Sequence, residues 1–147
     1  MAAGAVFFCG EKLMTDDEMV AAFERGEAPG GSFHHADHVR VAWCYLRRYD
    51  LPHAIARFAD ALKHFARAQG KADLYHETIT VAFLLIVAER LGETPDDVSW
   101  AEFAARHADL LTWKPSVLDR YYTSDRLWST RARRGFVMPD RVPQCPD

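Results

Sequence analysis

Hydrophobic residues recur at three- and four-residue steps along most of this chain, the spacing typical of amphipathic helices. The clearest series is Ile55, Phe58, Leu62 and Phe65, which would lie along one face of a helix. Segment 79–88 is apolar on nearly every side, so we expect it to form the most buried helix. The hydrophobic pattern therefore predicts a helical protein with one central, buried helix.

Capping signals and helix breakers divide this pattern into separate helices. Thr15–Glu18 and Ser99–Glu102 have the form of capping boxes, in which the first and fourth residues satisfy free amides at a helix start. Pro52 suits a first helical turn, and Ser32 follows a Pro-Gly-Gly break as a candidate cap. The expected helices are 16–24, 32–49, 50–70, 73–91, 99–113 and 123–135, with a short turn over 115–121.

Strand patterns are essentially absent, and residues 5–9 are the one candidate for a strand. Short connections between helices of this length favour antiparallel packing. The sequence of 147 residues, 49% of them hydrophobic, has the size of one domain and enough apolar residues for a core. We therefore predict an all-α, single-domain antiparallel bundle of five to six helices over 1–147, with irregular termini at 1–14 and 136–147.

Length, charge and cysteine content narrow the class of protein. The longest unbroken apolar run, Val81–Ala88, is far shorter than the roughly 20 residues that cross a bilayer. Cys9, Cys44 and Cys145 are too far apart for a thiolate metal site or a disulfide framework, which favours a reducing cytoplasm. The net charge of −3 gives no general attraction to nucleic acid or an anionic membrane. A small molecule is the expected partner, and a homodimer is compatible with the sequence.

Three histidines fall on predicted core-facing positions. At about 100° per residue, His35 and His38 lie on the apolar side of the second helix, opposite its charged residues. His76 heads the uncharged stripe His76, Thr80, Phe83 and Val87 of the fourth helix. A buried imidazole needs hydrogen bonds or a metal, because burying an unpaired polar group costs free energy.

The other four histidines have weaker placements. His34 lies at the margin of the same apolar arc, and His107 lies on the apolar side of the fifth helix. Whether either joins a site with the first three is open. His53 and His64 lie opposite the apolar face of the third helix, so we expect them to face water.

His35-x-x-His38 places two imidazoles one helical step apart, close enough to hold one ion. With His76 from a neighbouring helix they would provide three neutral nitrogen ligands, a set that suits a divalent transition metal: Zn, Fe, Cu or Ni. Zinc would activate water for hydrolysis, whereas iron or copper would support oxygen chemistry, and the sequence does not decide between them. The alternative is that each histidine separately donates to a backbone carbonyl in the core.

Several nearby side chains are candidates for a role beside such a metal. Glu77, Tyr45 and Tyr75 are candidates for proton transfer or for orienting a ligating histidine. The candidates for contacting a substrate are Trp43, Thr80, Phe83 and, from the arginine-rich segment 121–134, Arg131. The alternative is that these residues only pack in the core or face solvent and belong to no functional site.

The segments Phe33–Trp43, Tyr75–Thr78, Tyr121–Thr123 and Phe136–Asp140 resemble a family of small bacterial all-helical proteins, uncharacterised in function. Its pattern is F-x-H-x-x-H, then Y-H-x-T, then P-D. The resemblance implies that the three histidines act as a unit. The chain is more loosely similar to DinB-like helical bundles, which hold a metal with three differently spaced histidines, so that likeness is architectural.

Three functions follow from these patterns. The first is a metal-dependent enzyme that acts on a small organic substrate through the three-histidine site. The second is a non-catalytic protein that binds a small ligand or a metal. The third is a helical interaction module whose histidines are hydrogen-bonded core residues.

Overall fold

The structure is a computed structural model that describes residues 14–28 and 31–142, and within these ranges it contains helices and no strands. The predicted all-α fold is confirmed. Seven α-helices are present in these ranges: α1 Asp16–Glu24, α2 His35–Arg48, α3 Leu51–Ala68, α4 Glu77–Gly92, α5 Trp100–Arg106, α6 Ser124–Leu127 and α7 Thr130–Arg134. Three short 3-10 helices join them: η2 Ala72–Leu74, η3 Ala108–Leu111 and η4 Val117–Arg120.

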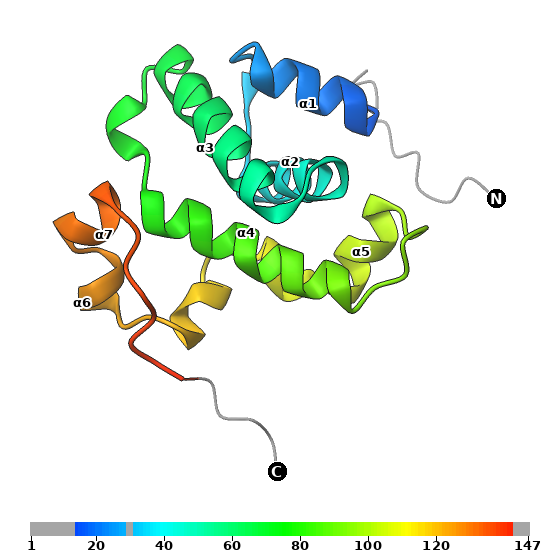
Figure 1. Cartoon of the computed structure of the whole chain (residues 1–147). Coiled ribbons are helices and arrows are strands. Elements are labelled where there is room, and N and C mark those ends of the chain that lie inside the picture. The colour runs from blue at the N-terminus through cyan, green and yellow to red at the C-terminus, as the bar shows by residue number, and fades with distance from the viewer. Residues whose placement is uncertain (1–13, 29–30, 143–147) are drawn as a thin grey trace.

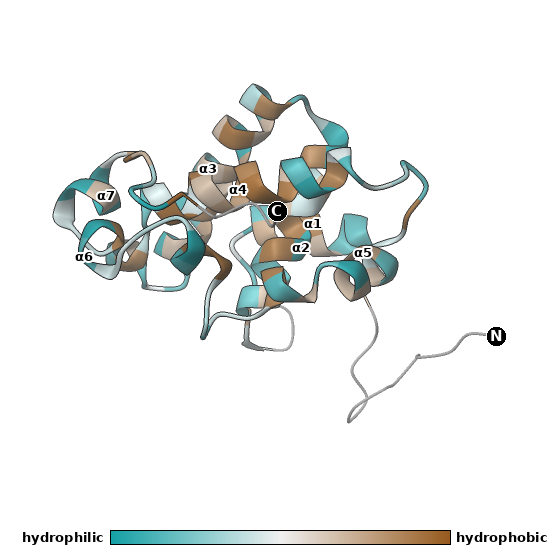
Figure 2. Ribbon diagram, turned by 90° about the horizontal axis from the view of Figure 1, so that it is seen from below, coloured by the Kyte–Doolittle hydropathy of each residue, from teal (hydrophilic) through white to brown (hydrophobic). Residues whose placement is uncertain are grey.

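Helix α4 crosses the middle of the molecule, as its apolar sequence predicts (Figure 1). Helices α1, α2 and α3 pack on one another at one side of it, and α2 and α3 both contact it. Helix α5 lies near the C-terminal end of α4, whereas α7 packs against α4 near its N-terminal end. Figure 2 shows hydrophobic residues concentrated on the central helices, while α6 and α7 are mostly hydrophilic.

The helix starts predicted from the two capping boxes are confirmed. The Thr15 hydroxyl accepts from the Glu18 amide at 3.1 Å, and the Ser99 hydroxyl accepts from the Glu102 amide at 3.2 Å. The Asp50 carboxylate caps α3 in the same way, before the proline of its first turn. Each bond satisfies an amide that has no partner within its own helix.

Other boundaries differ from the expectation. Helix α2 begins at His35, with His34 rather than Ser32 at its N-cap. The predicted fourth helix begins later, because residues 72–74 form a 3-10 turn and His76, with φ −136° and ψ 111°, is the N-cap of α4. Ser129 divides the predicted last helix into α6 and α7, because its hydroxyl caps the second of them.

The predicted fifth helix, 99–113, is also shorter than expected. Helix α5 ends at Arg106, and after His107 the chain continues as the 3-10 helix η3 before it turns away at Thr112.

The candidate strand at 5–9 lies outside the described residues. Within the described part of the chain, no helix is long and apolar enough to span a membrane.

Residues 136–142 are irregular, as predicted, but they are bonded to the helices, and the remaining residues of the predicted irregular C-terminus lie outside the described residues. The Thr78 hydroxyl donates to the Gly135 carbonyl at 2.9 Å and accepts from the Val137 amide at 3.1 Å. Further along, the Asp140 carboxylate accepts from both the amide and the hydroxyl of Thr123. These bonds hold α6 and α7 against the start of α4, beside the cavity described next.

Candidate ligand cavity

A cavity of about 800 Å³ lies between α2, α3 and α4 and extends to Trp113, Trp128 and α7. All three candidate metal ligands, His35, His38 and His76, line it. The volume is within the range of about 300–1,000 Å³ that is usual for small-molecule sites. The sequence pattern thus predicted that these three rings face a common interior space, although not what each of them bonds to.

His35, at the start of α2, is held by the backbone of η3. Its Nε2 lies 2.9 Å from the Leu110 carbonyl oxygen, so Nε2 carries the proton and donates it. The ring packs on Phe83, with centroids 5.0 Å apart, and on Trp113 at 5.2 Å. Burial lowers the pKa of His35, so the imidazole is neutral at pH 7 and Nδ1 is an acceptor.

His38 lies one turn further along α2, among phenylalanine rings. Its centroid is 4.6 Å from that of Phe33 and 5.9 Å from that of Phe65, both in edge-on geometry. Burial, and then the proximity of His35, lower the pKa of His38 to about 4, so this ring is neutral at pH 7. None of the side-chain hydrogen bonds among residues 14–28 and 31–142 involves His38. The residue is only partly buried, and its ring nitrogens remain accessible rather than buried without a partner.

His76 is fully hydrogen-bonded. Its Nδ1 accepts from the Ile79 amide at 3.1 Å and so caps α4, while Nε2 donates to the Leu127 carbonyl oxygen at 2.7 Å. Its ring is 5% exposed, lies edge-on to Trp128 at 5.5 Å, and has a pKa that burial lowers. The alternative prediction, in which a core histidine donates to a backbone carbonyl, is confirmed for His76 and His35.

The three rings share a cavity but do not converge on one point. Among the described residues, no group of three or more His, Cys, Asp or Glu side chains is placed to hold a metal ion. His76 would have to give up a helix cap or a buried hydrogen bond to become a ligand. Metal binding therefore stays a prediction, and it requires a rearrangement around His76.

Three other candidate residues line the cavity: Tyr75, Thr80 and Phe83. The Tyr75 hydroxyl donates to Glu77 at 2.5 Å, and burial together with this carboxylate raises the pKa of the phenol. The Thr80 hydroxyl donates to the His76 carbonyl at 2.8 Å, within the first turn of α4. Glu77 itself is not among the lining residues, so it reaches the cavity only through Tyr75.

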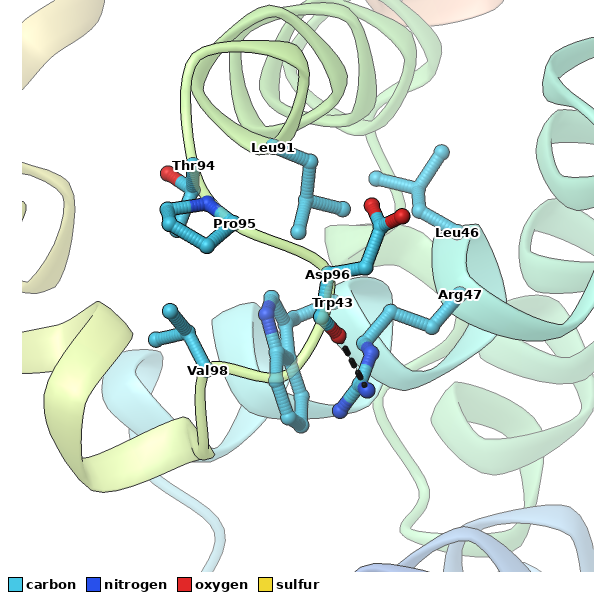
Figure 3. Close-up of a pocket in the computed structure, with 8 residues that line it drawn as sticks. All are labelled: Trp43, Leu46, Arg47, Leu91, Thr94, Pro95, Asp96 and Val98. Atoms are coloured by element: carbon cyan, nitrogen blue, oxygen red, sulfur yellow. Dashed lines mark hydrogen bonds between the residues drawn. The ribbon is translucent and has the colours of Figure 1, made fainter.

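Two candidates lie elsewhere in the core. The Tyr45 hydroxyl donates to Glu24 at 2.6 Å, across the contact between α2 and α1. Trp43 lines a separate, smaller cavity of about 300 Å³ beside the loop after α4 (Figure 3). There the Arg47 guanidinium stacks 4.6 Å from the Trp43 ring centroid and donates to the Asp96 carbonyl.

The remaining polar candidates are divided between the cavity mouth and the surface. Arg131 is exposed and does not line the cavity, whereas Arg133, two residues later, does. His34 lines the mouth and is exposed. His107 lies outside the cavity, between Arg90 and Thr94. His53 and His64 are exposed, as predicted.

Several residues that line the cavity were not predicted from the sequence: Phe65, Lys71, Trp113, Trp128 and Arg133. The tryptophans belong to irregular segments, where no helical periodicity assigns a direction to a side chain. Arg133 belongs to the same arginine-rich segment as the candidate Arg131, but an i, i+2 spacing puts the two on different faces of α7.

No known protein family, curated protein or solved structure matches this chain with significance.

Proposed function

We propose that the protein binds a small organic molecule in the cavity that His35, His38 and His76 line. The observation that carries this proposal is the state of His38, a partly buried imidazole that lines a cavity of about 800 Å³ and whose accessible ring nitrogens make no hydrogen bond to a described side chain or backbone group. Because these nitrogens have no partner in the protein, the hydrogen bonds they make come from water or a ligand in the cavity.

The lining of the cavity supports the same proposal. Small-molecule sites combine a mainly apolar surface with a few polar groups that orient the ligand. Here the apolar part comes from aromatic and aliphatic side chains of α2, α3 and α4, and His38, Tyr75 and Thr80 supply polar atoms. These residues come from separate helices, so the cavity depends on the fold as a whole.

Filling the cavity tests the proposal. Ala66 of α3 lines the cavity and is only partly buried, so Ala66→Trp places an indole in the space without disturbing the deepest core. Ala56→Trp, at an exposed position of the same helix, is the matched control. The probe is 2-naphthol, an apolar aromatic with one hydroxyl, and its binding is measured by isothermal titration calorimetry.

We expect one site per chain in the native protein and in Ala56→Trp, with affinity reduced at least tenfold in Ala66→Trp. His38→Phe, which keeps an aromatic ring but removes both nitrogens, should weaken binding several-fold. If Ala66→Trp and Ala56→Trp bind the probe equally, the proposal is wrong, because the probe then binds elsewhere.

A metal-dependent reaction is the second candidate. It is favoured by two observations: His35 and His38 line one cavity a turn apart, and Nδ1 of His35 has no hydrogen-bond partner among the described residues. Two such imidazoles would hold a divalent transition metal with positions left for a third ligand and substrate. Tyr75, with Glu77 behind it, is the group best placed to move a proton at this site.

Elemental analysis of the freshly purified protein, beside alanine variants of His35, His38 and His76, tests this second candidate. About one metal ion per chain, lost in all three variants, would support a metal-dependent reaction. Zinc would then point to hydrolysis, whereas iron or copper would point to oxygen chemistry. No metal after incubation with each ion would rule it out and leave the ligand-binding proposal standing.

A further inference from the structure

Two aromatic clusters contribute to the lining of the cavity. The phenylalanine cluster consists of Phe33, which lies before α2, His38 near the start of α2, and Phe65 on α3. Its ring centroids lie 4.6 Å (Phe33 to His38), 4.9 Å (Phe33 to Phe65) and 5.9 Å (His38 to Phe65) apart. Both nitrogens of its single imidazole are unbonded within the described ranges, so the cluster offers flat apolar faces and one polar edge.

The tryptophan cluster runs as an unbroken series of contacts from α2 to α4. His35 lies 5.0 Å from Phe83 and 5.2 Å from Trp113, and Trp113 lies 6.4 Å from Trp128. Trp128 in turn lies 5.5 Å from His76. Aromatic faces and edges favour contact with other aromatic rings at these separations, so a cavity with two such clusters suits a planar aromatic body.

The charged groups of the lining are all positive. Lys71 and Arg133 line the cavity, and no aspartate or glutamate among the described residues does. Asp37, near the mouth, bonds to the backbone amide of His34, and Glu77 bonds to the Tyr75 hydroxyl. The lining of the cavity therefore carries positive charges and no carboxylate among the described residues.

Arg133 is the cation best placed to bind a ligand. Its guanidinium makes no ion pair with a carboxylate in residues 14–28 and 31–142, and its nearest acceptors are the carbonyls of Asp73 and Leu74, at the long distances of 3.4 and 3.5 Å. Arg133 and His76 line the same cavity, and after burial the charge of Arg133 also lowers the pKa of that imidazole. A partly buried guanidinium with weak partners can form two parallel hydrogen bonds to a carboxylate.

We propose that the ligand of this cavity is a planar aromatic carboxylate, whose ring contacts the two aromatic clusters and whose carboxylate pairs with Arg133. The inference rests on the proposed function and adds the class of ligand to it. Lys71, which is exposed at the rim, contributes long-range attraction and no fixed contact.

Three isosteric probes test the charge: 2-naphthoate, 2-naphthamide and 2-naphthamidine, which are anionic, neutral and cationic at pH 7.5. Their affinities are measured by calorimetry, and the loss of affinity in Ala66→Trp reports whether each probe binds in the cavity. We expect 2-naphthoate to bind about tenfold more tightly than the amide, as for one charge-assisted pair, and the amidine to bind most weakly.

Arg133→Gln should remove most of the preference for 2-naphthoate and leave the affinity for 2-naphthamide unchanged. Arg134→Gln is the matched control, because Arg134 is exposed and does not line the cavity. An equal loss in both variants would overturn the inference, since general electrostatics would then explain the preference. Amide or amidine binding as tightly as the carboxylate would also overturn it.

These outcomes are separable from a failure of the proposed function. If the three probes bind with equal affinity and Ala66→Trp weakens all of them, the cavity binds ligands but does not select carboxylates. If no probe binding is sensitive to Ala66→Trp, both the inference and the proposed function are wrong.

Discussion

The imidazole of His76 is predicted to be a major source of stability, because it makes two bonds that no other side chain replaces. In His76→Ala the first turn of α4 loses its cap at the Ile79 amide, which costs about 1 kcal/mol. The buried Leu127 carbonyl also loses its donor, and a buried group left unpaired costs about 1–3 kcal/mol. The free energy of unfolding should therefore fall by about 2–4 kcal/mol.

Asparagine separates the two contributions. In His76→Asn the side-chain carbonyl can still accept from the Ile79 amide, so this variant should be about 1 kcal/mol more stable than His76→Ala. His53→Ala is the matched control, because His53 lies in the first turn of α3 but is exposed, and it should change stability by less than about 0.5 kcal/mol.

Urea denaturation, followed by circular dichroism at pH 7.5 with and without chelator, measures these differences. The reasoning fails if His76→Ala unfolds at the same urea concentration as the native protein, or if asparagine is no better than alanine. It also fails if chelator lowers the native protein to the stability of His76→Ala, because the imidazole would then act through a bound metal rather than through its two hydrogen bonds.

Two further predictions concern pH and backbone conformation. Because folding lowers the pKa of His38 from 6.5 to about 4, the unfolded state takes up its proton first as pH falls below 6.5. The free energy of unfolding, relative to that of His38→Phe, should therefore be constant above pH 6.5 and fall by about 2 kcal/mol by pH 5. Parallel pH profiles of the unfolding free energy in the two proteins would contradict this prediction. Gly26→Ala should destabilise by more than Gly70→Ala, as judged by urea midpoints. Both glycines have positive φ, 77° and 71°, but only at Gly26 would a Cβ lie 2.6 Å from that of Ala68. Equal midpoints would refute the close contact.

Local signals were sufficient to predict most of the fold. A hydroxyl or carboxylate followed by an apolar helical series marks the starts at Thr15, Asp50 and Ser99, and these caps involve residues only three positions apart. The buried position of α4 follows from its composition alone. At Ser129 the break is also local, because the Ser129 hydroxyl accepts from the Ala132 amide, but the sequence analysis predicted one long helix there instead of two short ones.

His76 illustrates the limit of periodicity. Imidazole is not among the favoured caps, so the sequence placed this ring on a helical stripe, whereas the chain places it in extended backbone before α4. Its orientation toward the cavity was nevertheless predicted, because the N-cap lies directly before the stripe of Thr80 and Phe83 and all three residues line the same space.

The bonding of the histidines could not be predicted, since it depends on segments without periodicity. The acceptors for His35 and His76 are the carbonyls of Leu110 and Leu127, which lie 75 and 51 positions away in η3 and at the end of α6. A sequence pattern can show that an imidazole ring faces the interior. It does not show whether the ring nitrogens bond to a metal or to a backbone carbonyl, because either partner suits a buried imidazole. His38, which has neither partner among the described residues, is therefore the residue at which ligand binding, metal binding and simple core packing make different predictions.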